Sequence, residues 1–549
     1  MRGYGLQGFN AITGKEFAED MLKKQVKQPE FVDFYLPFGG KLRADNRWVE
    51  LSRLVPWDAV EEEYAKGLSE EQGRPALSAR VAVGTLIVKE RLGTTDRETM
   101  EQIRENPYLQ YFLGYHEYGE ELPFDATMLV HFRKRFPLES WQRLSDRLIM
   151  DAQEEESARQ AEADGSTVSV SEDEEPLAAV GRAGSSKKGP EQSEVKKSHG
   201  GQLIIDVTAA PCDIRHPRDL GLVNEAREKS EQILDELYAH CREAIKEKPR
   251  SYRRVARRRF ARVARQKKVR REKVRQELNW QLNCVERNLK NIDTLLDHTA
   301  LTVLPPRLQR LLPVIRQVAC EQRDRWRFGG LVKQTIYSLS QPHIRAIYRG
   351  KAAHSFEFGP KLSVSVANGF ACVDRLQWTP YNECSDLLDQ IRACKKRFGV
   401  YPESVLADRI YRTRNNRRIC KWLKIRLSAL PLGRPGSDHS QALKTLAQDE
   451  KDRNAVEGKI GQLKRRFSLN RLMGKLKATC ESIVGCIFFC ANLLRCQALG
   501  LKGLFLRLYS RASPILHSHP KLHIPRKPTI FYPLHSIQIP GLSFNKKAA

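Results

Sequence analysis

The chain has 549 residues, of which 41% are hydrophobic, and this length predicts more than one domain with a sizeable buried core. Its 94 Lys and Arg exceed its 66 Asp and Glu, and the formal net charge of +28 favours a polyanionic partner, with nucleic acid ahead of an anionic membrane. Twelve scattered cysteines without a Cys-x-x-Cys pair, and an N-terminus that lacks a signal-peptide pattern, exclude a disulfide-stabilised secreted protein and predict a cytoplasmic one with reduced thiols.

Residues 1–150 have the pattern of an all-α domain. An apolar helix is predicted over residues 77–92, and Thr95 to Glu98 form a capping box for the next helix. Asp125 is the predicted N-cap of a third, basic helix. Short helices that end in a basic one fit either a helix-turn-helix DNA reader or a helical bundle with a charged outer face.

Residues 151–200 are predicted to be a disordered linker, because they are acidic, then rich in Gly, Ser and Lys, and contain few apolar residues. An acidic linker in a basic protein suits a solubilising tether better than a segment that folds back as a DNA mimic. Residues 501–549 contain repeated Pro without clear periodicity and are predicted to be poorly ordered. The four histidines at positions 517, 519, 523 and 535 are a weak metal signal.

A short apolar stretch with β-branched residues, 203–208, predicts a buried strand. Asp206 interrupts it. A carboxylate in such a strand needs an ion pair, hydrogen bonds or a metal ion, because burial of an uncompensated charge is costly.

Helical patterns fill an insertion of about residues 220–345, and residues 250–275 within it are extremely basic. Like charges repel along a helix, so this segment is predicted to contact phosphates rather than to be an inert solvated surface. The residues predicted to bind DNA here are Arg253, Arg254, Arg257, Arg258, Arg259, Arg262, Lys267 and Lys268.

Strand patterns return at residues 361–366 and 370–373, and the Asn368-Gly369 pair between them is a hairpin signal. An amphipathic helix is predicted over residues 384–397. The strand predicted at residues 404–408 ends in a second aspartate, Asp408. A helix at 415–423 and a strand at 425–430 follow.

Residues 452–467 are predicted to form a helix on which Arg453, Glu457 and Lys464 share one face. This face fits either a solvated Arg453–Glu457 ion pair, which stabilises a helix by roughly 0.3–0.5 kcal/mol, or a carboxylate that holds a metal beside a phosphate backbone. The last helix, within residues 479–501, is apolar but contains Glu481 and Arg495, which favours a buried helix over a membrane span.

The order of these elements resembles the catalytic domain of the DDE transposases encoded by bacterial insertion sequences. Short segments in the same order strengthen the resemblance, which extends over roughly residues 10–500: 206–208 with 217–219, 349–351, 358–361, 407–413 and 431–435. The family signature around its last carboxylate is Tyr-x2-Arg-x3-Glu-x6-Lys. Arg453, Glu457 and Lys464 match it, whereas Glu450 stands where the family has Tyr.

The resemblance implies an α/β fold, namely a ribonuclease-H-like mixed sheet with a helical insertion over residues 201–500, preceded by the all-α domain. It implies that Asp206, Asp408 and Glu457 hold two Mg²⁺ or Mn²⁺ ions, about 3.5–4 Å apart. It also implies that Arg453 and Lys464 contact DNA, that the partner is double-stranded DNA, and that a homodimer acts on it in the nucleoid. The reaction would be cleavage at element ends followed by strand transfer.

The sequence leaves two other functions open. A nuclease that only hydrolyses DNA would use the same carboxylates. A DNA-binding protein that has lost catalysis would keep the basic surface without using them.

Overall fold

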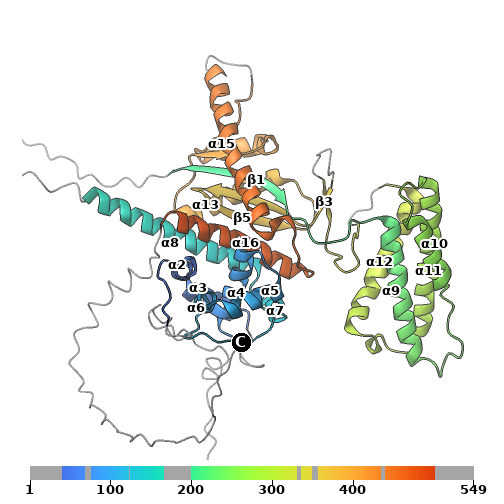
Figure 1. Cartoon of the computed structure of the whole chain (residues 1–549). Coiled ribbons are helices and arrows are strands. Elements are labelled where there is room, and N and C mark those ends of the chain that lie inside the picture. The colour runs from blue at the N-terminus through green and yellow to red at the C-terminus, as the bar shows by residue number, and fades with distance from the viewer. Residues whose placement is uncertain are drawn as a thin grey trace, which may run out of the picture. The chain divides into compact units, whose positions relative to one another are not determined.

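The computed structural model describes residues 40–68, 76–122, 124–165, 199–330, 335–348, 356–433 and 439–500. Many helices surround a five-stranded mixed sheet, so the predicted α/β class is confirmed (Figure 1). The N-terminal helices are α2 (Arg47–Leu54), α3 (Trp57–Ala65), α4 (Ala79–Leu92), α5 (Asp96–Glu105), α6 (Pro107–Phe112), α7 (Met128–Arg135) and α8 (Leu138–Gly165).

Local signals explain where the N-terminal helices begin and end. Ser78 caps α4 and Gly93, with φ 70°, ends it. Thr95 accepts a hydrogen bond from the Glu98 amide at the start of α5, as predicted. The predicted cap at Asp125 is wrong: its carboxylate accepts from the amide and hydroxyl of Thr127, which fixes a turn before α7. Residue 127, not 125, precedes the helix.

Helix α8 corrects the predicted linker, because it continues through residue 165. Ala152 and Glu155 on this extension are buried. Arg159 donates to the carbonyl oxygens of Leu499 and Gly500 beyond the end of α16 (Lys477–Ala498). These contacts offset the low apolar content from which disorder was predicted. Residues 166–198 and 501–549 lie outside the described residues.

The N-terminal helices and the sheet share one hydrophobic core. Trp141 of α8 is fully buried and donates its indole N–H to Ser482 of α16 at 3.1 Å. A Cβ on Gly485 would lie 2.6 Å from the Trp141 Cβ, so only glycine allows the two helices this approach. Helix α16 is long and apolar enough to cross a membrane, but 83% of its most apolar stretch is buried inside the protein.

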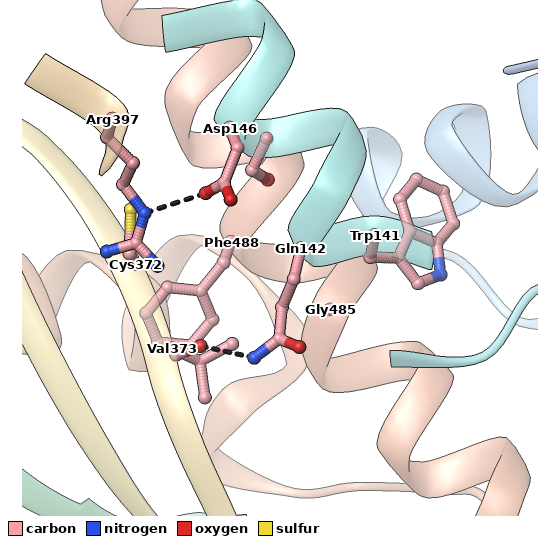
Figure 2. A pocket seen from close by; sticks show the side chains of 9 residues that line it. Trp141, Gln142, Asp146, Cys372, Val373, Arg397, Gly485 and Phe488 are labelled. Atoms are coloured by element: carbon pink, nitrogen blue, oxygen red, sulfur yellow. Dashed lines mark hydrogen bonds and ion pairs between the residues drawn. The ribbon is translucent and has the colours of Figure 1, made fainter. Parts of the chain in front are cut away.

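A small pocket marks the junction between α8 and the sheet (Figure 2). On one side Gln142 donates to the Val373 carbonyl oxygen at 2.7 Å. On the other, the Arg397 guanidinium donates to Asp146 at 2.7 Å and to Asp374 at 2.8 Å. The pocket is lined by packed and paired side chains, and neither Asp206, Asp408 nor Glu457 is among them.

The helical insertion has a hydrophobic core of its own. Asn288 of α11 donates to Ser230 of α9 at 3.0 Å inside it. Its helices are α9 (Asp219–His240), α10 (Arg253–Ala264), α11 (Arg271–Leu296) and α12 (Pro306–Phe328), as the sequence predicts for this stretch.

The sheet has the strand order β5-β4-β1-β6-β7, with β1 in the centre. Strand β4 is antiparallel to both of its neighbours, β1 and β5. Strand β6 is parallel to both of its neighbours, β1 and β7. Asn368 and Gly369 both have positive φ in the predicted hairpin turn. The strands are β1 (Gln202–Ala209), β4 (Lys361–Ala367), β5 (Phe370–Gln377), β6 (Ser404–Leu406) and β7 (Arg426–Leu427), the last shorter than predicted.

The remaining elements cover the sheet or extend from it. A two-stranded hairpin, β2 (Ala346–Tyr348) with β3 (Phe356–Phe358), lies before β4. A Cβ on Gly359 would lie 2.0 Å from the Ala210 carbonyl oxygen, so this glycine lets the chain after β1 pack closely. The helices are α13 (Leu387–Phe398), α14 (Arg414–Trp422), α15 (His439–Arg466) and α16.

Candidate functional site

Asp206 and Asp408 lie at matching positions on neighbouring parallel chain segments. Ile204 of β1 pairs with Leu406 of β6, and each aspartate follows two residues later. Residues two apart in extended chain point to the same face, and neighbouring strands are roughly 4.8 Å apart. The strand register therefore brings the two aspartates to one end and one face of the sheet.

Glu457 comes from the helix that covers this same face. Ile204 and Leu406 are buried in one core with Val456 of α15, whereas Leu203 and Val405 face a different core on the other side of the sheet. Helix α15 packs against β1, beside which Figure 1 shows it, and also against β6. Glu457 follows Val456 directly, so the buried valine places the carboxylate at the border of the packed face.

The electrostatics of Asp206 connect the three carboxylates. Burial raises the pKa of Asp206, and the negative charges of Glu457 and Asp408 raise this pKa further. The Val207 amide, which donates to Asp206 at 2.8 Å, and the positive Arg453 act in the opposite direction. A cation bound among the three carboxylates would reduce the repulsion between Asp206 and the other two.

The side chains as placed do not form a coordination shell. Across the ranges that the structure describes, no three His, Cys, Asp or Glu residues form a group that could hold a metal ion. Glu457 is 60% exposed and lies 3.8 Å from Arg453, which is the solvated ion pair that the helix pattern also allowed. The donors themselves fit a hard divalent cation, because all three are carboxylates.

The family position occupied by Glu450 has a definite neighbour. Its carboxylate lies 3.7 Å from Arg412, the residue directly after the 3-10 turn η5 (Arg409–Tyr411), which itself follows Asp408. Lys464 is half-buried near the end of α15. Arg453 and Lys464 therefore lie on the helix that carries Glu457, as predicted, while Glu450 makes an ion pair that a tyrosine could not make.

Sequence reasoning missed the residues that anchor α15. Arg426 of β7 forms two hydrogen bonds, at 2.5 and 2.9 Å, with the buried carboxylate of Asp449. This pair joins the edge of the sheet to α15 two turns before Glu457. An arginine at a strand edge and an aspartate on a helix give no pairing signal in sequence, so only the fold reveals the contact.

The basic segment of the insertion divides into paired and exposed residues. Arg253 donates to Asp235 at 2.7 Å, and Arg259 donates to the buried Glu277 at 3.1 Å while it lies over the Trp280 ring. These two arginines hold α10 in place. The other predicted DNA-binding residues are exposed: Arg254, Arg257, Arg258, Arg262, Lys267 and Lys268.

Two family models match the chain on separate stretches. Residues 37–135 match a transposase domain (DUF772), and residues 405–494 match a transposase DDE domain. The second stretch contains Asp408 and Glu457, whereas Asp206 lies outside both. Both models describe transposase domains. They confirm the resemblance to the DDE transposases of insertion sequences that the ordered motifs indicated.

A curated relative adds no functional detail. The chain is 27% identical over 217 residues, 40% of its own length, to 83% of an uncharacterized protein, ORF8 in the nfe locus of Rhizobium meliloti. No solved structure matches the chain.

Proposed function

We propose that the chain cleaves DNA at the ends of an insertion sequence and joins those ends to target DNA, with Asp206, Asp408 and Glu457 as catalytic residues. The observation that supports this most strongly is the parallel register of β1 with β6, which gives Asp206 on β1 and Asp408 just after β6 matching positions, beneath the helix that bears Glu457. This arrangement would bring three acidic residues that are far apart in sequence toward one face of the sheet.

We interpret the mixed sheet as the ribonuclease-H-like sheet that the family implies. Its central strand β1 supplies the first carboxylate, and the neighbouring β6 leads to the second. The proposed domains are the N-terminal helices, a catalytic domain over residues 201–500 and the insertion within it. The N-terminal helices and the catalytic domain share one core through α8, α16 and the sheet, so we expect these two domains to fold as one unit.

The carboxylates would hold Mg²⁺ or Mn²⁺, and two such ions supply an activated water or 3′-hydroxyl and stabilise the leaving oxygen of an in-line displacement. As the family resemblance implies, Asp206 would contribute to both ion sites. The Glu457 carboxylate would have to leave Arg453 to take part, because the two are paired in the structure. Arg453, once released, would be available for a DNA phosphate beside the site.

The exposed cations of α10 and the following loop would hold the DNA. Contacts to phosphates provide affinity without reading sequence, and their strength falls steeply with salt. The N-terminal helices would supply end recognition or the contacts of a homodimer, which places two chains on the two ends of the element.

Paired-end DNA substrates with Mg²⁺ or Mn²⁺ test the proposal directly. The wild-type chain should yield both cleaved ends and strand-transfer products, whereas a simple nuclease would yield nicks alone. Glu457→Gln should abolish both products and still bind DNA. Cleavage by this variant at the wild-type rate would remove Glu457 from the site.

A matched control separates the site from general surface charge. Asp389 on α13 is an exposed acid with an arginine partner on its own helix at 3.6 Å, much as Glu457 has at 3.8 Å. Asp389→Asn should therefore cleave and transfer strands like the wild type. Equal losses in both variants would indicate a nonspecific charge effect and contradict the assignment.

A further inference from the structure

Helix α14 begins six residues after Asp408 and is held to the protein by its inner face. The buried Asn416 side chain donates to the carbonyl oxygens of Cys384 and Tyr411, both at 2.9 Å. Arg417 donates to the Leu430 carbonyl oxygen at 2.5 Å. These polar anchors fix the rotation of a short helix, so its outer face has a defined direction.

The outer face combines cations with an exposed tryptophan. Arg414, Arg418 and Lys421 follow each other at steps of four and three residues, which aligns them on one side of a helix. Trp422 lies one step of four beyond Arg418 and is 79% exposed. Arg418 donates to Asn415 on its own helix, and among the described residues the side chains of Arg414, Lys421 and Trp422 make no hydrogen bond, ion pair or ring contact.

An indole left this exposed is unusual for a residue that serves only the fold. Tryptophan is normally highly buried, and aromatic side chains are enriched where a partner will cover them. Acidic residues are absent from α14, whose sequence runs RNNRRICKW. The chemistry of this face, with several positive charges around one flat apolar ring, is complementary to phosphates flanking a base or a groove wall.

The position of α14 limits where such DNA would be. Six residues of extended chain span at most roughly 20 Å, so Arg414 lies within that distance of Asp408. Base pairs rise about 3.4 Å each, so this distance corresponds to about six base pairs of duplex. Cys420 of α14 is buried in the core of Leu203 and Val405, on the sheet face opposite Val456 of α15, so a duplex that reaches both Asp408 and the outer face of α14 has to pass around the end of the sheet.

We propose that the outer face of α14 is a second DNA contact, distinct from the insertion, which binds duplex within about six base pairs of the reacting phosphate. Arg414, Arg418 and Lys421 contact the phosphates, and Trp422 packs against the groove as an apolar wedge. This inference rests on the proposed function, because it is the carboxylate site that positions the duplex.

Binding of an element-end duplex to the full chain, followed by fluorescence anisotropy over a range of salt, tests the wedge. Trp422→Ala should weaken binding by about 10-fold, the size expected for loss of one aromatic–base contact, without changing the salt dependence. Trp422→Phe should retain most of the affinity. Met473→Ala, which removes another exposed apolar side chain, should bind like the wild type.

Loss of the cations on α14, unlike loss of Trp422, should change the salt dependence of DNA binding. Replacing Arg414, Arg418 and Lys421 together by Gln should flatten the slope of log K against log salt by about 2.7, at 0.9 for each lost phosphate contact. Hydroxyl-radical footprints of this variant should lose protection within about six base pairs of the cleaved bond. Unchanged affinity and slope in all α14 variants, or lost protection only farther away, would overturn the proposal.

Three further outcomes can be distinguished from one another. If the variants change the oligomeric state in sedimentation but leave DNA affinity intact, α14 contacts protein, and the proposal is wrong. If the wild-type chain does not cleave with either metal, the proposed function fails, but the α14 contact is still tested by binding alone. If the wild type cleaves and the α14 variants bind normally, only the α14 contact fails.

Discussion

The N-terminal helices and the helical insertion are both all-α, but they bury their apolar faces against different partners. Helices α2 to α8 share one core with α16 and the sheet, through contacts such as Trp141 with Ser482. Helices α9 to α12 bury theirs against each other. Under the proposed function, DNA contacts made by the insertion would leave the carboxylate site undisturbed, whereas the N-terminal helices belong to the framework that includes the sheet.

Removal of a fully buried tryptophan from the shared core should have the greatest effect. Trp141→Ala leaves a cavity against α16 and should lower the free energy of unfolding by about 3–5 kcal/mol. Because the core is shared, N-terminal helices and sheet should lose protection together in hydrogen exchange. Loss of protection confined to α2 to α8 would show that the two regions are separate after all.

A truncation in the insertion core provides the opposite test. Ile292 of α11 is fully buried there, and Ile292→Ala should destabilise the insertion by about 2–5 kcal/mol. Hydrogen exchange should quicken in α9, α11 and α12, while β4 and α16 remain protected. Equal quickening in β4 would contradict the independence of the insertion core.

The exposed cations of the insertion should affect binding and leave stability unchanged. Replacing Arg257, Arg258 and Arg262 by Gln should weaken DNA binding about tenfold or more at moderate salt and flatten the salt slope by about 2.7. Arg259→Gln is the comparison, because that side chain supports Glu277 and Trp280 and should lower the melting temperature instead. An unchanged slope in the triple variant would mean that this segment is inert surface.

The smallest effect concerns a salt bridge within the N-terminal framework. Hydrogen bonds from Arg143 lower the pKa of Glu63 to about 2. A lowered folded-state pKa means that the stability from this pair is present above about pH 4.5 and is lost as pH falls toward 2. Glu63→Gln should cost about 1 kcal/mol at pH 7 and nothing once the pH is well below the folded-state pKa of about 2. A pH-independent difference in melting temperature would argue against the pair.

Elements with strong local signals were predictable from the sequence. The β-branched stretch around Asp206 forms β1, and the Asn368-Gly369 turn adopts the predicted hairpin. The ion pair of Arg453 with Glu457 follows from helical spacing alone. In each case the residues that determine the structure are neighbours along the chain or along one helix.

Features that depend on distant partners were not predictable. The end of α8 looks like a linker until Glu155 and Arg159 meet the end of α16, and periodicity cannot show that contact. The Arg426–Asp449 pair joins a strand edge to a helix that sequence gives no reason to connect. For the candidate site, the three acidic residues were predicted from the sequence. Only the pairing of β1 with β6 showed that Asp206 and Asp408 are at matching positions along neighbouring strands.

The most direct test of the carboxylate site is Mn²⁺ binding, measured by electron paramagnetic resonance on the full chain with element-end DNA. The wild-type chain should bind two Mn²⁺ ions per site, and Asp206→Asn should lose binding while Asp389→Asn keeps it. Equal Mn²⁺ binding by the wild type and Asp206→Asn would contradict a metal site built on Asp206, Asp408 and Glu457.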